Sequence, residues 1–143
     1  MDSNNSNDHE ILQNREIGLI QFYRRVLANA LDKSVPLLER LNYLCIVCRS
    51  CDELFEVRVA RLLKWNKSDP DKILADGLTA KESLSLVRDA VVKLYDDIYQ
   101  VYDTSLIPDL IHEKIFILPS NKWNAAQQNF IYNYFMHELK PIL

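Results

Sequence analysis

Apolar side chains recur at helical spacing along most of the chain. Residues 15–31 place them at steps of three, four and seven, which predicts a first helix. The main positions of this apolar face are Ile17, Ile20, Leu27 and Leu31. Further apolar and aromatic residues widen the face, and only a narrow strip is polar. We therefore expect this helix to be buried on most sides, or to pack against something beyond this chain.

A second helix is predicted from about Pro36 to about Trp65. Proline is tolerated in the first turn of a helix, and the length of this segment favours a kink midway. The connector that follows contains Asp69 and Pro70, which we expect to open a short helical turn closed by Gly77.

Two capping-box sequences predict the later helix starts. Thr79 with Glu82 begins a long helix that Pro108 should kink or restart. Asn124 with Gln127 begins the last helix. Its predicted inward residues are Phe130, Ile131, Tyr134, Phe135 and Leu139. Between the two helices, residues 115–118 form the one strand-like apolar run.

These patterns predict an all-α bundle of about four helices, with at most one short strand-like segment near 115–118. We expect residues 1–13 to be a disordered polar tail and residues 14–143 to form one helical domain. Short connections favour antiparallel packing of consecutive helices.

Composition narrows the function classes. The chain has 143 residues, 17 Lys and Arg against 20 Asp and Glu, and only two glycines. The scarcity of glycine excludes a P-loop or a dinucleotide-binding fingerprint. The net charge of −3 argues against a nucleic-acid partner. No transmembrane segment or signal peptide is expected, and three cysteines favour free thiols and a cytoplasmic location.

Cys45, Cys48 and Cys51 resemble the start of an iron–sulfur ligand run, but Phe55 stands where the fourth ligand would be. Because this stretch is helical, the cysteines fan around the helix. We favour small core residues over a metal site, so no metal ligand is predicted.

The remaining polar groups suggest no catalytic residue. His9, His112 and His137 have no metal-ligand spacing, and we favour solvated or capping roles for them. Asp52, Glu53 and Glu56 are expected to pair with Arg49 and Arg58 along one helix face, with acid–base work as the alternative. The ladder of Arg58, Arg61, Lys64 and Lys67 is expected to be solvated, with phosphate binding as the alternative.

Longer motifs resemble the N-terminal domain of bacterial polyphosphate kinase. Residues 35–41 read VPLLERL and residues 52–60 read DELFEVRVA, close to the family patterns VPLLERL and LDEFFxVRVA. Residues 15–27 are similar to the opening RELSWLxFNxRVL, and residues 130–143 to YFxxxVxPVL. The resemblance covers about residues 14–143.

This resemblance implies a role in transferring the terminal phosphate of ATP to polyphosphate, with magnesium, through a phosphorylated histidine in later domains. The N-terminal domain would pack on those remaining domains and support the adenine side of the nucleotide pocket. The chain ends where the linker to the next domain would begin, so we expect a domain fragment or a truncated reading frame, inactive alone. ATP and Mg would belong to the parent enzyme.

The resemblance also implies a nucleotide contact. The family asparagine that contacts ATP corresponds to Ser50, and Arg49 is the nearest cation. Serine offers one hydroxyl in place of an amide with a separate donor and acceptor. Gly18 and Leu19 replace Ser and Trp of the family, and Tyr23 replaces Asn.

An alternative is a stand-alone helical interaction module that has lost the enzyme. The apolar breadth of the first helix motivates it, because exposed apolar surface marks partner sites. Self-association into a homo-oligomer is expected if such a face is uncovered.

Overall fold

The computed structural model describes residues 14–143, so the tail predicted over residues 1–13 and His9 lie outside the described part. The all-α prediction is confirmed: within residues 14–143 the regular elements are helical, apart from an isolated antiparallel bridge between Ile73 and Thr79. The longer helices are α1 (Arg15–Ala28), α2 (Leu37–Glu53), α3 (Ala60–Ser68), α4 (Ala80–Val101), α5 (Ile107–His112) and α6 (Ala125–Tyr134).

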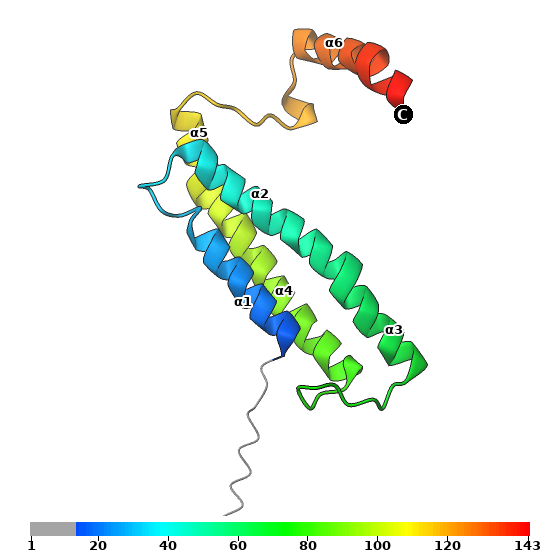
Figure 1. Ribbon diagram of the computed structural model, residues 1–143. Helices are drawn as coiled ribbons and strands as arrows, with labels where there is room; N and C mark the ends of the chain where they lie inside the picture. Colours follow the sequence, from blue (N-terminus) through cyan, green and yellow to red (C-terminus); the bar gives the residue numbers. More distant parts are fainter. Residues whose placement is uncertain (1–13) are drawn as a thin grey trace, which may run out of the picture. The chain divides into compact units, whose positions relative to one another are not determined.

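The chain divides into two compact units, Met1–Asp109 and Leu110–Leu143. The first holds three long helical rods: α1, then α2 continuing into α3, then α4 (Figure 1). The sequence predicted a single domain over 14–143, with the fourth helix in the same bundle. In the structure, that fourth helix, α6, belongs to the second unit.

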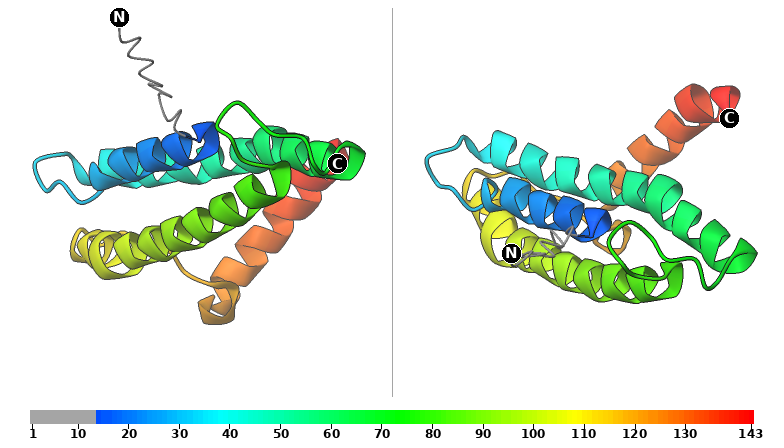
Figure 2. Two further views of the ribbon diagram at one scale, coloured as in Figure 1. Left: turned by 90° about the horizontal axis from the view of Figure 1, so that it is seen from below. Right: turned by 60° about the horizontal axis from the view of Figure 1, so that its bottom comes forward.

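Consecutive rods of the first unit run antiparallel, as the short connections predicted, and α1 runs parallel to α4 (Figure 2). Polar contacts fix this register. Asn14 at the start of α1 donates to the Ser83 hydroxyl at 3.3 Å, and Arg24 pairs with Asp97 at 3.0 Å. The helix α1 packs on both α2 and α4, and α3 packs on α4.

The core of the first unit lies between these rods. Ile20 and Leu27 of α1 are buried as predicted, whereas Ile17 is half-buried and Leu31 is 50% exposed. Leu31 lies beyond the end of α1, because the helix stops at Ala28 rather than at 31. The other buried core residues include Leu44, Val47, Cys51, Leu54, Leu62, Val87, Val91, Leu94 and Ile98.

A π-helical segment lies midway along the predicted second helix. η1 (Leu54–Val59) joins α2 to α3 without a break, and the helix continues to Ser68, three residues past Trp65. A π-helical insertion adds a residue to the turn and shifts the side chains that follow around the helix axis.

The connector between α3 and α4 is a turn rather than the short helix predicted near Pro70. Gly77 has φ of +80° and donates its backbone N–H to Leu74 O at 3.0 Å. Leu74 in turn donates to Leu78 O at 2.8 Å, and the Ile73–Thr79 bridge closes the loop. Glycine is therefore used here for its left-handed backbone and not as a helix C-cap.

Both predicted capping boxes are present. Thr79 and Glu82 exchange side-chain and backbone bonds at the start of α4, and Asn124 and Gln127 do so at α6. Pro108 lies in the first turn of α5, directly after the π-helical segment η2 (Tyr102–Leu106), and the helix runs from α4 through η2 into α5 without a break.

The second unit corrects two expectations. Residues 115–118 form no strand: they are irregular and exposed between α5 and η3 (Ser120–Lys122), and the Ile115 N–H donates to Leu110 O at 2.8 Å. The apolar face of α6 does not point into a core, because its side chains are exposed, with Phe130 at 69% and Tyr134 at 50%. The helix continues through η4 (Phe135–Leu139) and η5 (Lys140–Ile142).

Candidate functional site

Ser50 and Arg49 lie in the last turn of α2, just before η1. Ser50 is half-buried, and its hydroxyl donates to the backbone carbonyl of Ile46 at 2.8 Å. Arg49 is exposed and forms no ion pair within residues 14–143. Since the Ser50 proton is engaged by its own helix, the oxygen remains free as an acceptor.

Two tyrosines of the neighbouring helices, Tyr23 and Tyr95, interact electrostatically with residues of the last turn of α2. Tyr23 of α1 has a raised pKa because it is buried and lies in the field of Cys51 and Glu53, with Arg58 opposing. Tyr95 of α4 has a raised pKa, again mainly through burial. Tyr23, at a position where the family has Asn, is therefore a buried core residue that no longer offers an amide.

The charged groups around Ser50 do not pair as predicted. Asp52, Glu53 and Glu56 form no ion pair with Arg49 or Arg58 anywhere in the described chain. All three carboxylates are exposed, so hydration takes the place of pairing along the helix.

The predicted basic ladder does not lie on a single face of the helix. Its members are Arg58, Arg61, Lys64 and Lys67. Side chains three residues apart drift around an α-helix, so Arg58 and Lys67 point in different directions. Arg58 and Arg61 are half-buried, whereas Lys64 and Lys67 are exposed. Arg61 is drawn to the neighbouring α1, where it contacts Glu16 at 3.5 Å.

The three cysteines are free thiols in distinct environments. Cys51 is buried in the core and Cys48 is half-buried, but Cys45 is exposed, so the core interpretation is wrong for Cys45. Burial raises the pKa of the Cys51 thiol to about 11. No group of three or more His, Cys, Asp or Glu among residues 14–143 is arranged to hold a metal ion.

The two described histidines lie on exposed surface. His112 is near Glu113, with Nδ1 3.3 Å from the carboxylate, and His137 is exposed in η4. The described residues also hold no cluster of carboxylates that fits the magnesium implied by the resemblance.

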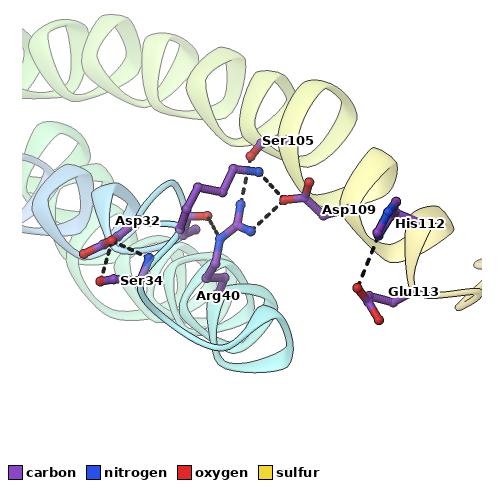
Figure 3. Close-up of polar contacts among 9 residues, drawn as sticks. Asp32, Ser34, Arg40, Ser105, Asp109, His112 and Glu113 are labelled. Carbon is purple, nitrogen blue, oxygen red and sulfur yellow. Dashed lines mark hydrogen bonds and ion pairs between the residues drawn. The ribbon is translucent and has the colours of Figure 1, made fainter.

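A polar cluster that sequence reasoning missed surrounds Arg40 at the end of the first unit (Figure 3). The Arg40 side chain is 4% exposed. Its Nε donates to Ala30 O at 2.8 Å, Nη1 to the Asp109 carboxylate at 2.6 Å and Nη2 to the Ser105 hydroxyl at 2.9 Å. Lys33 also pairs with Asp109. These bonds compensate the burial of a charge, so the cluster is structural.

One signal for this cluster was present in the sequence. Arg40 precedes the core residues Leu44 and Val47 by four and seven residues, which places it on the buried face of α2. A charged residue at such a position requires a partner. Its partner Asp109 could not be identified from a sequence separation of 69 residues.

Among the described residues, no helix combines the length and the apolar composition of a membrane span.

Comparison with known proteins shows the family to which the chain belongs. A family model described as "Polyphosphate kinase N-terminal domain" matches residues 12–118. The chain belongs to this family, as the VPLLERL and DELFEVRVA motifs predicted.

Curated relatives agree with that assignment. The polyphosphate kinase of Neisseria meningitidis serogroup A / serotype 4A is 44% identical over 129 residues, which is 90% of this chain and 19% of that protein. The polyphosphate kinase of Burkholderia vietnamiensis is 39% identical over 132 residues, 92% of this chain and 19% of that protein. No solved structure matches the chain.

The chain thus spans about a fifth of the length of the curated relatives it matches, and it corresponds to their N-terminal part. The family model ends at residue 118, shortly after the boundary between the two units at Asp109.

Proposed function

We propose that this domain serves a polyphosphate kinase by supporting the adenine side of the nucleotide pocket, and that it supplies no catalytic group of its own. The observation that carries the proposal is the match of about nine-tenths of the chain to polyphosphate kinases at about 40% identity. The parent reaction transfers the terminal phosphate of ATP to a polyphosphate chain. Further domains, with ATP and Mg, are its partners in this role.

Ser50 is the residue proposed to contact the nucleotide. Its hydroxyl proton is held by Ile46 O, so the oxygen can accept one N–H from the adenine amine while the helix bond remains. Arg49 stands beside it in sequence as an exposed cation, available to a phosphate or a ribose oxygen. Asparagine at position 50 would add a donor that serine in this geometry lacks.

This contact can be tested in a chimera in which the present chain replaces the matching N-terminal part of the Neisseria meningitidis polyphosphate kinase. We expect Ser50→Asn to tighten ATP binding about twofold to thirteenfold, since one net hydrogen bond is worth ~0.5–1.5 kcal/mol. Ser85→Asn on the exposed surface of α4 is the matched control and should change nothing. Equal ATP affinity in Ser50→Asn and Ser85→Asn would leave Ser50 without a role.

The exposed apolar surface supports packing against other domains. In the first unit, a groove of about 320 Å³ is lined largely by apolar side chains, among them Phe55, Val59, Leu63 and Val91. In the second unit, the aromatic face of α6 is uncovered. Uncovered apolar surface of this kind favours association, and the remaining domains of a polyphosphate kinase are the proposed partners.

The same surface favours a second candidate, a stand-alone interaction module that keeps the fold without the enzyme. The two functions separate by experiment. A module would bind its partner as the isolated chain and would give no polyphosphate synthesis in the chimera. We place either form in the cytoplasm, in keeping with three free thiols.

A further inference from the structure

A pocket of about 350 Å³ lies at the end of the first unit where α1 begins and α3 ends. Trp65 and Leu74 form much of its apolar wall. Arg15, Glu16 and Arg61 supply charged groups along its edge. An apolar pocket with a few converging polar groups is the usual form of a small-ligand site.

The hydrogen-bond donors of the Arg61 guanidinium are only partly used in this pocket. Its Nη2 reaches Glu16 Oε1 at 3.5 Å, a long contact, and its buried Nε has no hydrogen-bond partner among the described residues. The guanidinium carbon lies 5.1 Å from the centroid of the Trp65 ring. A guanidinium carries five N–H donors, so most of its binding capacity remains unused.

The charges around the pocket leave a positive excess. The Asp76 carboxylate is already occupied, because it accepts from Asn14 Nδ2 at 2.6 Å and from Leu78 N at 3.2 Å. Glu16 is engaged by Arg61. Arg15 and Lys72 form no ion pair within residues 14–143, and Lys72 Nζ lies 5.3 Å from the Trp65 ring centroid.

We infer that this pocket binds a phosphate group, which takes the place of Glu16 as the partner of Arg61 and is joined by Arg15 and Lys72. The phosphate can belong to a small phosphorylated molecule or to a polyphosphate chain. Guanidinium groups bind phosphate in a charge-assisted, two-pronged geometry that the 3.5 Å contact to Glu16 does not achieve. Ser50 and Arg49 do not line the pocket, so the inference is independent of the proposed nucleotide contact.

Trp65 provides the readout. The chain has two tryptophans, so Trp123→Phe leaves Trp65 as the single fluorophore. In that background, pyrophosphate is titrated at constant ionic strength, with sodium chloride as the balancing salt. We expect a saturable change in Trp65 emission.

Three variants separate phosphate binding from a general salt effect. Arg61→Gln should weaken pyrophosphate binding at least about tenfold, because it removes the positive charge and the paired N–H donors of the guanidinium. Glu16→Gln should strengthen binding several-fold, since it removes the internal competitor. Arg88→Gln, on the exposed surface of α4 and away from the pocket, should have no effect. Circular dichroism checks that each variant is helical, and Arg61→Lys, which keeps the charge, replaces Arg61→Gln if that variant does not fold.

The source of the phosphate is read from parallel titrations with ATP and with long-chain polyphosphate. If polyphosphate binds more tightly than pyrophosphate, the site is assigned to a polyphosphate chain. If ATP binds more tightly than pyrophosphate, the site is assigned to a small phosphorylated molecule. A response that does not saturate, or one that is equal in Arg61→Gln and Arg88→Gln, would overturn the inference. Unchanged affinity in a folded Glu16→Gln variant would do the same.

Discussion

The Arg40 guanidinium donates to the Asp109 carboxylate at 2.6 Å and thereby ties α2 to the last residue of the first unit. The same arginine holds Ala30 O and Ser105 Oγ, so three segments of the chain meet on one side chain. The arrangement places a buried charge at the end of the bundle and satisfies it from each neighbouring element.

Removing this arginine should loosen that end of the bundle. We expect Arg40→Met to lower the free energy of unfolding by about 1–3 kcal/mol, because Ala30 O and the Ser105 hydroxyl lose a buried donor. Urea unfolding followed by circular dichroism measures the effect. Arg24→Met, which removes an exposed ion pair with Asp97, is the control and should cost much less. Equal losses in the two variants would show that burial of Arg40 adds nothing.

The cluster also makes stability depend on pH. Hydrogen bonds from Lys33 and Arg40 hold the pKa of Asp109 below its ordinary value of 3.8. A carboxylate with a lowered pKa in the folded state stabilises the fold above its unfolded pKa, and this contribution is lost as pH falls through the folded pKa. We therefore expect stability to fall on acidification below about pH 4. Asp109→Asn should be less stable at neutral pH and should show a weaker fall. An identical pH profile in the two proteins would contradict this role.

The capping box of α4 should contribute measurably. Thr79 Oγ1 accepts from the Glu82 backbone N–H at 3.2 Å. Replacing it in Thr79→Ala leaves that donor without its cap and should cost about 1 kcal/mol. Thr79→Ser, which keeps the hydroxyl, should restore most of the loss in thermal unfolding. Equal melting of the Ala and Ser variants would argue against the cap.

Gly77 offers a test of backbone conformation separated from packing. A Cβ added there would meet no atom within 4 Å, so only its φ of +80° opposes a side chain. Gly77→Ala should cost roughly 1–2 kcal/mol, the strain of an L-residue in the left-handed region. Gly77→Asn should cost less, because asparagine tolerates that region better. Chemical denaturation of the two variants decides the order.

The three thiols should react in the order of their exposure. Cys45 is exposed and should be alkylated rapidly at pH 8, followed by Cys48. Cys51, with a pKa of about 11 and a buried side chain, should react only when the chain unfolds. Mass spectrometry of time-resolved alkylation gives the order. Rapid labelling of Cys51 in the folded chain would contradict its placement in the core.

Sequence patterns predicted the features that depend on neighbours along the chain. The two capping boxes and the buried positions Ile20 and Leu27 of α1 follow from local spacing and are present in the structure. The Arg40 cluster depends on a partner 69 residues away, and helical periodicity carries no information on such pairs.

Residues 115–118 and α6 differ from the sequence prediction because their environments depend on partners that are not adjacent in the sequence. The apolar run at 115–118 has strand-like composition, but no neighbouring strand exists within the described chain to accept its hydrogen bonds. The amphipathic pattern of α6 predicts a covered face, yet Phe130 is 69% exposed. A pattern records that a face is apolar and does not record which molecule or segment covers it.

The most direct test of the proposed role is polyphosphate synthesis from ATP by three proteins: the chimera, the Neisseria meningitidis kinase lacking its matching N-terminal part, and the present chain alone. We predict that the chimera synthesises polyphosphate, while the deletion protein and the chain alone do not. Synthesis by the isolated chain, or a folded chimera no more active than the deletion protein, would contradict the role of this domain as a non-catalytic support of a polyphosphate kinase.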